Sequence, residues 1–127
     1  MTKNIVPLED KHASHPIATD WRPILTAVVE RFVEGDFSLS SPVPGVLPVD
    51  PDIARQNKEY VSSYGQPLIS LSNAVWNSSC AQWMGKNWEI IVDLCTATEG
   101  VSDLVLTGKV ANVNGQPVFT VGLIYVP

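Results

Sequence analysis

The pair Asn114-Gly115 lies between two segments in which apolar and polar residues alternate. Asn and Gly both accept the positive φ angles of the tight turns that join antiparallel strands, so this pair is a strong hairpin signal. A two-residue turn at this point pairs Val110 with Phe119. Further along the same hairpin it pairs Leu104 with Tyr125, and both pairs join residues of the apolar face. Turn and hydrophobic pattern therefore agree in predicting that the chain ends in an antiparallel hairpin.

The segment before this hairpin, residues 88–95, has the same two-residue period and is expected to add another strand. The apolar positions on its inward face are Trp88, Ile90, Val92 and Leu94. Two registers with the neighbouring strand keep these positions inward. One sets Asp93 opposite Asp103, where two like charges destabilise the pairing. The other sets Glu89 opposite Lys109, and we expect this second register.

An amphipathic helix is expected over residues 21–34, because apolar residues recur there every three or four positions. They are Trp21, Ile24, Leu25, Val28, Val29, Phe32 and Val33. Asp20 suits the N-cap of this helix, and Gly35 suits its end.

A second helix is expected to begin at Asp50 and Pro51, which suit the N-cap and the first helical position. Gly65 suits its end. Its buried stripe is expected to be Ile53, Asn57, Tyr60, Val61 and Tyr64.

These patterns predict the α+β class, with two N-terminal helices packed on one face of a C-terminal antiparallel β-meander of three to four strands. Residues 1–19 show no sustained period and contain Pro7 and Pro16, so they are expected to form a flexible N-terminal arm. Residues 20–127 are expected to form a single α+β domain, because that length suffices for one hydrophobic core.

The net charge of −5 argues against nucleic-acid binding, because polyphosphate attracts proteins with an excess of Lys and Arg. No apolar segment reaches the length of a membrane span or of a signal-peptide core, so we expect a cytoplasmic protein that does not contact membranes. Cys80 and Cys95 lack the spacing of redox and zinc motifs, and we expect them to be reduced thiols.

The sequence lacks the short motifs of the common hydrolases, nucleotide-binding proteins and zinc proteases. Its two histidines, His12 and His15, both lie in the expected arm, with no second pair of metal ligands beside them. We therefore expect no enzymatic activity, no cofactor and no metal site.

The segment "TEGVSDLVLTG", residues 98–108, carries an acid on each side of a glycine. As a turn, Gly100 would supply a positive φ angle and Ser102 or Asp103 would bond loop amides, so that no catalytic or metal-binding role is needed. A divalent-cation site needs several converging oxygens, and the spacing matches no EF-hand. As a docking surface, exposed acids would attract a basic protein partner. The residues expected to bind such a partner are Glu89, Asp93, Glu99 and Asp103.

The alternative function is a small-molecule-binding or enzymatic domain with a pocket between the helices and the sheet. The residues expected to line that pocket are Trp21, Phe32, Tyr60, Trp88 and Tyr125, with Asp93 or Tyr60 as the polar group. A drug-sized apolar cavity would support this hypothesis, and a fully packed core would contradict it.

A third hypothesis is a structural subunit that associates with itself through an unpaired strand edge. The expected state is a monomer or a weak dimer.

The block "WEIIVDLCTATEGVSDLVL" at residues 88–106, with "FVEGDF" before it and "YVP" at the end, resembles a family of small, uncharacterised bacterial single-domain proteins. That resemblance covers residues 20–127 and implies no established activity. In size and charge the chain also resembles immunity proteins of bacterial toxin systems, including contact-dependent growth inhibition. This resemblance implies a protein that binds and neutralises a cognate toxin, such as a nuclease whose phosphate-binding cleft is basic.

Overall fold

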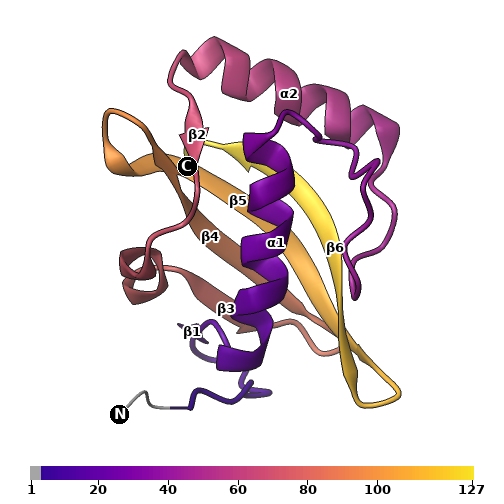
Figure 1. Cartoon of the computed structure of the whole chain (residues 1–127). Helices are drawn as coiled ribbons and strands as arrows, with labels where there is room; N and C mark the ends of the chain where they lie inside the picture. Colours follow the sequence, from indigo (N-terminus) through magenta and orange to yellow (C-terminus); the bar gives the residue numbers. More distant parts are fainter. Residues whose placement is uncertain (1–3) are drawn as a thin grey trace.

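In the part of the chain that the structure describes, six antiparallel strands form one open sheet, and two α-helices lie against it (Figure 1). This computed structural model describes residues 4–127. From the N-terminus the elements are β1 (His15–Pro16), the 3₁₀ helix η1 (Thr19–Trp21), α1 (Arg22–Val33), α2 (Pro51–Tyr64), β2 (Leu68–Ile69), the 3₁₀ helix η2 (Asn73–Asn77), β3 (Cys80–Trp83), β4 (Trp88–Thr96), β5 (Gly100–Val113) and β6 (Gln116–Tyr125). The strand order is β1-β3-β4-β5-β6, and β2 pairs with β4.

The predicted α+β class is confirmed, whereas the sheet has six strands rather than three to four. The additional strands are the short ones. Strands β1 and β2 contain two residues each, and β3 contains four. Such segments are too short to show a two-residue period in the sequence.

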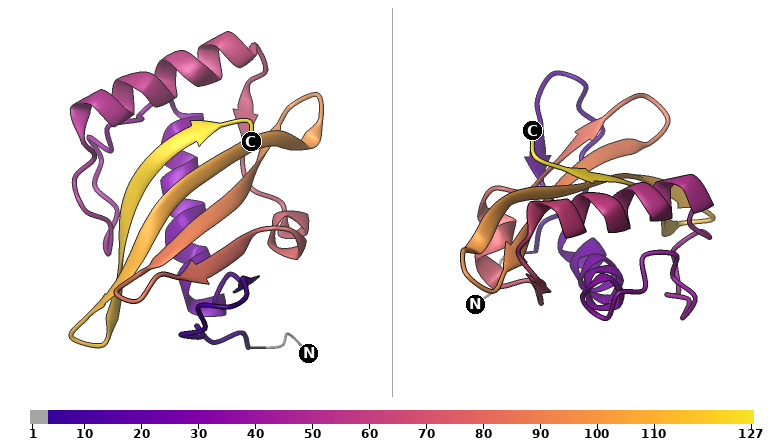
Figure 2. Two further views of the ribbon diagram at one scale, coloured as in Figure 1. Left: turned by 180° about the vertical axis from the view of Figure 1, so that it is seen from behind. Right: turned by 90° about the horizontal axis from the view of Figure 1, so that it is seen from above.

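Helix α1 lies across one face of the sheet, whereas α2 runs past the end of β6 (Figure 2). The buried residues of α1 are Leu25, Val28, Val29 and Phe32. The prediction that both helices pack on the same face is therefore wrong for α2. The buried residues of α2 are Ala54 and Asn57. A buried amide needs hydrogen-bond partners, which a strand edge offers and an apolar sheet face does not.

The core lies between α1 and the inward face of the sheet. The predicted inward residues of β4 are all buried: Trp88, Ile90, Val92 and Leu94. Trp21 meets Trp88 edge to face with ring centroids 5.2 Å apart, and Phe32 stacks on Phe37 at 5.1 Å. Aromatic pairs at these separations fill the space between helix and sheet.

The two predicted N-caps have different outcomes. Asp50 caps α2, because its Oδ1 accepts the backbone N–H groups of Asp52 at 2.8 Å and Ile53 at 3.4 Å. Asp20 does not cap α1. It lies inside η1, Trp21 takes the N-cap position, and no side-chain capping bond is present there. The 3₁₀ turn delays the start of α1 beyond the reach of the Asp20 carboxylate.

The expected N-terminal arm packs along the domain over residues 4–18, and its residues 1–3 lie outside the described part of the chain. Strand β1 pairs with β3 at the edge of the sheet. Trp88 Nε1 donates a hydrogen bond to the carbonyl oxygen of Leu8 at 2.9 Å. Ile17 and Ala18 belong to the buried core. Two buried side chains give no period, which is why the sequence pattern predicted a loose segment.

Both predicted register anchors are present, since Val110 lies opposite Phe119 and Glu89 lies opposite Lys109. The predicted pairing of Leu104 with Tyr125 is wrong. A β-bulge intervenes between Val121 and Ile124, so that Tyr125 lies opposite Val105 instead. Beyond the bulge, β6 residues therefore face the side opposite to the one that simple alternation predicts.

Candidate binding site on the open sheet face

The face of the sheet that points away from α1 is not covered by any helix of residues 4–127 (Figure 2). We call it the open face. Antiparallel sheets often leave one face to solvent, but that face is then usually polar. Here it carries large hydrophobic side chains that are more than a third exposed, among them Ile91, Leu123 and Tyr125.

The β-bulge in β6 is the reason that two of these side chains point outward. Thr107 of β5 lies opposite two residues of β6, Gly122 and Leu123. As a result Leu123 is 38% exposed while the next residue, Ile124, is 2% exposed. Without the bulge, Leu123 and Tyr125 would face the core together with Val121, as the sequence pattern predicted.

Gly122 allows the two strands to approach at the bulge. A Cβ atom at this position would lie 2.8 Å from the carbonyl oxygen of Thr107 and 2.9 Å from its Oγ1. Thr107 Oγ1 uses the same space to donate a hydrogen bond to the carbonyl oxygen of Leu123 at 2.8 Å. Residue 122 therefore has to be glycine for this local geometry to form without displacement.

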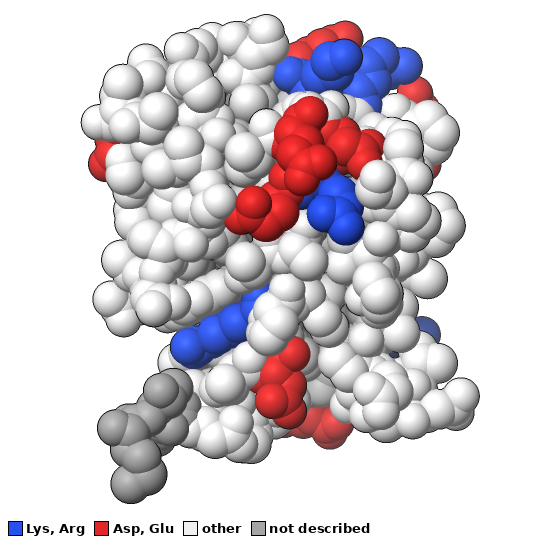
Figure 3. Space-filling model, viewed as in Figure 1, with Lys and Arg blue, Asp and Glu red and all other residues white. Residues whose placement is uncertain are grey.

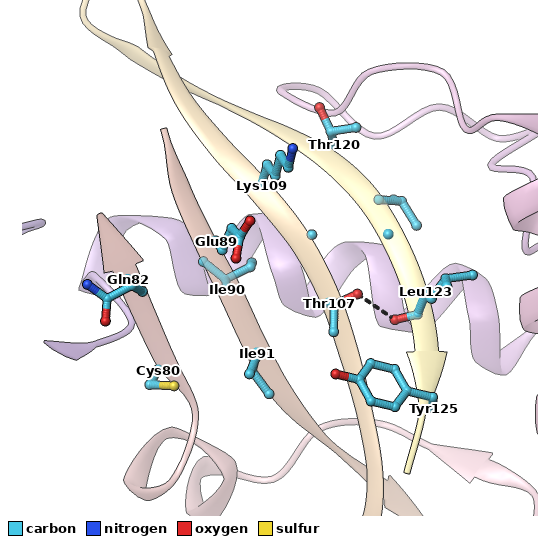
Figure 4. Close-up of a pocket in the computed structure, with 13 residues that line it drawn as sticks. Cys80, Gln82, Glu89, Ile90, Ile91, Thr107, Lys109, Thr120, Leu123 and Tyr125 are labelled. Carbon is cyan, nitrogen blue, oxygen red and sulfur yellow. Dashed lines mark hydrogen bonds between the residues drawn. The ribbon is translucent and has the colours of Figure 1, made fainter. Parts of the chain in front are cut away.

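A hollow of about 510 Å³ lies on the open face (Figure 4). Its lining includes Ile91, Thr107, Gly122, Leu123 and Tyr125. A second hollow of about 430 Å³ lies beside it, between β6 and the exposed side of α2, where Tyr60 contributes. Leu123 and Tyr125 line both hollows. The two depressions thus form one continuous surface with Leu123 and Tyr125 at its centre.

The hollow on the open face has no excess of either charge. Glu89 and Lys109 are the charged residues among the described ones that line it, and they lie directly opposite each other on β4 and β5. The net charge of the chain, −5, therefore comes from other surfaces. Figure 3 shows the α1 side of the molecule, where acidic side chains gather in clusters.

The four acids expected to bind a basic partner do not form one set of free carboxylates. Glu89 lies on the open face beside Lys109. Asp93 accepts a hydrogen bond from the Ser78 hydroxyl. Glu99 is engaged by α2, as described next, and Asp103 is exposed near it.

Glu99 joins the loop between β4 and β5 to the end of α2. The Tyr64 hydroxyl donates to Glu99 Oε1 and Oε2, at 2.8 and 2.9 Å, and Thr96 Oγ1 lies 3.1 Å from Oε1. The hydrogen bond to Glu99, together with the nearby charges of Glu99 and Asp103, raises the pKa of Tyr64 above its usual value. Glu99 therefore holds the loop against α2, and this structural role agrees with the interpretation of the segment as a turn.

Cys80 lines the open-face hollow, and Cys95 is buried. Burial raises the pKa of the Cys80 thiol, and the charge of Asp93 raises it further. The thiol therefore stays protonated at neutral pH, which is the less reactive form.

The structure contradicts the predicted pocket between the helices and the sheet. Trp21, Phe32 and Trp88 are buried in the core. The void beside Trp21, between α1 and β6, measures about 10 Å³, which is too small for a ligand larger than a single water molecule. Tyr60 and Tyr125 lie outside the core, on the two surface hollows. The five residues therefore do not line a common cavity.

A family model described as a domain of unknown function, DUF7668, matches residues 29–127. This chain belongs to the DUF7668 family. The match begins within α1 and includes β2 to β6, so the whole open face belongs to the part of the chain that this DUF7668 domain defines. No curated protein and no solved structure matches the chain.

Within residues 4–127, no three His, Cys, Asp or Glu side chains group so that they could hold a metal ion. His15 Nε2 instead lies 2.9 Å from Asp10 Oδ2 within the N-terminal segment. No helix in that same range has the length and apolar character needed to span a bilayer.

Proposed function

We propose that this domain is a non-enzymatic protein-binding module whose contact surface is the open face of the sheet. The observation that carries the proposal is the β-bulge at Gly122 and Leu123, which turns Leu123 and Tyr125 out of the core. Burying a large apolar side chain such as Leu123 stabilises a protein by roughly 1.5–3 kcal/mol. The fold forgoes this stabilisation at Leu123, and a partner that covers the residue would recover it. β-Bulges are often used to re-aim side chains at functional sites.

The chemistry of the exposed residues supports a protein partner. Tyr is among the residue types that contribute most to binding at protein interfaces, and Tyr125 and Tyr60 flank Leu123 on the continuous surface. Gly122 lines the open-face hollow and packs against Thr107 of the neighbouring strand, which holds Leu123 in its outward position. Glu89 and Lys109 supply polar contacts beside this apolar centre.

In its specific form, we propose that this module is an immunity protein that acts in the cytoplasm and neutralises a cognate bacterial toxin. The net charge of −5 supports that form, because it would speed the encounter with a basic toxin such as a nuclease. The contact itself would then be made by the open face and not by the four acids together.

Growth rescue tests this proposal. The protein is co-expressed with any product of the neighbouring genes that arrests growth by itself, and growth is compared with that of cells carrying that product alone. Leu123→Asp should abolish rescue, because it places a charge at the centre of the apolar surface. Leu47→Asp is the matched control, since Leu47 is 48% exposed on another part of the surface. Equal rescue by both variants, with folding confirmed by circular dichroism, would rule out the open face as the contact surface.

A further inference from the structure

We propose that the open face of the free protein binds a second copy of the same chain, so that the protein forms a two-fold symmetric dimer. This inference rests on the proposed function, because it names a partner for the same protein-binding surface. Three observations support it: the arrangement of charge on the open face, the closure of the exposed edge of β6, and the apolar centre of the face.

The charges on the open face are complementary to themselves. Glu89 and Lys109 lie side by side on the adjacent strands β4 and β5. Consider a two-fold axis that lies in the interface between the two sheets, parallel to the strands and above the line between β4 and β5. This axis places β4 of one copy over β5 of the other. Glu89 then faces the partner's Lys109, and Lys109 faces the partner's Glu89, as a two-fold interface requires. Four charges of alternating sign result, and no like charges meet at this point.

The open-face hollow is also a surface on which two copies of an acidic chain can meet without net repulsion. Its lining holds one acid and one base, while the chain as a whole carries −5. The nearest further acid on β4, Asp93, is outside the lining and accepts the Ser78 hydroxyl.

Self-association through the strand edge, which the sequence suggested, is blocked at β6. The backbone of Phe119 bonds Gly45 and Leu47, with N–H to oxygen distances of 2.8 and 3.0 Å. Asn57 bonds Gly122 and Ile124 further along the same edge. A covered edge prevents strand addition at β6, so what the β6 side of the sheet offers to a second copy is the exposed apolar surface of its face.

Face-to-face sheets pack about 10 Å apart with their side chains between them. In the dimer, Ile91, Leu123 and Tyr125 of each copy would fill that space. The lining of the open-face hollow comes from four adjacent strands, β3 to β6, which corresponds to a few hundred Å² per copy at about 4.8 Å between strands. Because stable complexes bury about 800 Å² per partner, we expect a reversible dimer with a micromolar dissociation constant.

Sedimentation equilibrium of the full chain, from about 1 μM to about 1 mM, measures the association. The wild-type protein should pass from monomer to dimer within this range. Leu123→Asp should weaken the dimer by about 100-fold or more, whereas Leu47→Asp should associate like the wild type. A wild-type protein that stays monomeric throughout, or a dimer that Leu123→Asp leaves intact, overturns the inference.

Two charge-reversal variants test the symmetry directly. Glu89→Lys and Lys109→Glu should each dimerise about tenfold more weakly alone, because like charges then meet across the interface. Mixed together, they should form a heterodimer with wild-type affinity, since each reversed charge faces its opposite. The controls are Glu34→Lys and Lys58→Glu, which carry the same net charges but reverse exposed residues at the end of α1 and on α2, and each should dimerise like the wild type. Equal weakening of the dimer by these controls would reject the proposed Glu89–Lys109 contact, as would a mixture of Glu89→Lys and Lys109→Glu that associates no more tightly than either variant alone.

The rescue assay separates failure of this inference from failure of the proposed function. A monomeric wild-type protein whose rescue is lost in Leu123→Asp would overturn the dimer and leave the binding module in place, with the toxin as occupant of the open face. If the wild-type protein dimerises, Leu123→Asp abolishes the dimer, and the wild type does not rescue growth, the dimer is supported and the immunity role is overturned.

Discussion

The side chain of Asn57 makes hydrogen bonds to the backbone near Ile124 that a neighbouring strand would otherwise make. The N–H of Ile124 donates to Asn57 Oδ1 at 2.8 Å, and Asn57 Nδ2 donates to the carbonyl oxygen of Gly122 at 3.0 Å. Asn57 is fully buried, so both bonds form away from water. They join α2 to the edge of β6 on both sides of the bulged residue Leu123, and they thereby couple the helix to the open face.

Replacing Asn57 by Leu should reduce the free energy of unfolding by about 2–4 kcal/mol, because it leaves one buried donor and one buried acceptor without partners. Denaturation with urea, followed by far-UV circular dichroism, measures the change. Asn112→Leu provides the matched control, since Asn112 is exposed on β5 and should change stability by less than about 0.5 kcal/mol. Similar midpoints for the two variants would show that the Asn57 bonds do not hold the edge.

The two aspartates that the sequence assigned to helix N-caps should respond differently to removal. Asp50→Ala should cost about 1 kcal/mol, because its carboxylate accepts the first free N–H groups of α2. Asp20→Ala should cost much less, because Asp20 makes no capping bond to α1. Thermal unfolding of both variants gives the comparison. A larger loss for Asp20→Ala would contradict the cap assignment.

Local patterns predicted most of the fold because each depends on neighbouring residues. Alternation and the Asn114-Gly115 turn defined the last strands as far as the pair Val110–Phe119, and the Glu89–Lys109 register followed from charge. The β-bulge escaped prediction because Leu123 and Tyr125 continue the alternating pattern in the sequence. The change of face is visible only in the register of the folded strands and in the burial of Ile124 beside the exposed Leu123.

The candidate site was harder to predict because its residues obtain their roles from distant partners. Glu99 was chosen for its charge, but its carboxylate is bonded to Tyr64, 35 residues away. Asn57 was correctly placed on the buried stripe of α2, yet its partners on β6 lie 65 and 67 residues away. Residue type alone cannot distinguish a free carboxylate from one that holds two elements together.

Gly122→Ala should destabilise the protein by about 1–3 kcal/mol, because the new methyl group would press against Thr107. It should also weaken any binding at the open face, since strand separation moves Leu123 and Tyr125. Gly35→Ala is the comparison for glycine substitution without a clash, because nothing lies within 4 Å of its Cβ position and only its φ of +86° is unfavourable. Unchanged stability in Gly122→Ala would show that the bulge tolerates a side chain.

The contact between Tyr64 and Glu99 predicts a specific loss of stability at alkaline pH. The pKa of Tyr64 is raised in the folded state, so the hydrogen bond stabilises the fold fully below the unfolded pKa of about 10 and is lost as the pH rises through the folded value. Tyr64→Phe should therefore show a flatter decline of stability above about pH 10 than the wild type. Urea titrations at a series of pH values test this, and identical slopes would exclude the contact as the cause.

The Cys80 thiol should react slowly with thiol reagents although it lines the open-face hollow. Burial and the charge of Asp93 raise its pKa, so a smaller fraction is thiolate at any given pH than in a free cysteine. Asp93→Asn removes the charge and should speed labelling by Ellman's reagent, measured at pH 8 in a Cys95→Ala background. Glu89→Gln removes a carboxylate from the same strand that lies opposite Lys109, and it should change the rate less. Equal acceleration by both substitutions would show that general surface charge, and not Asp93, controls the thiol.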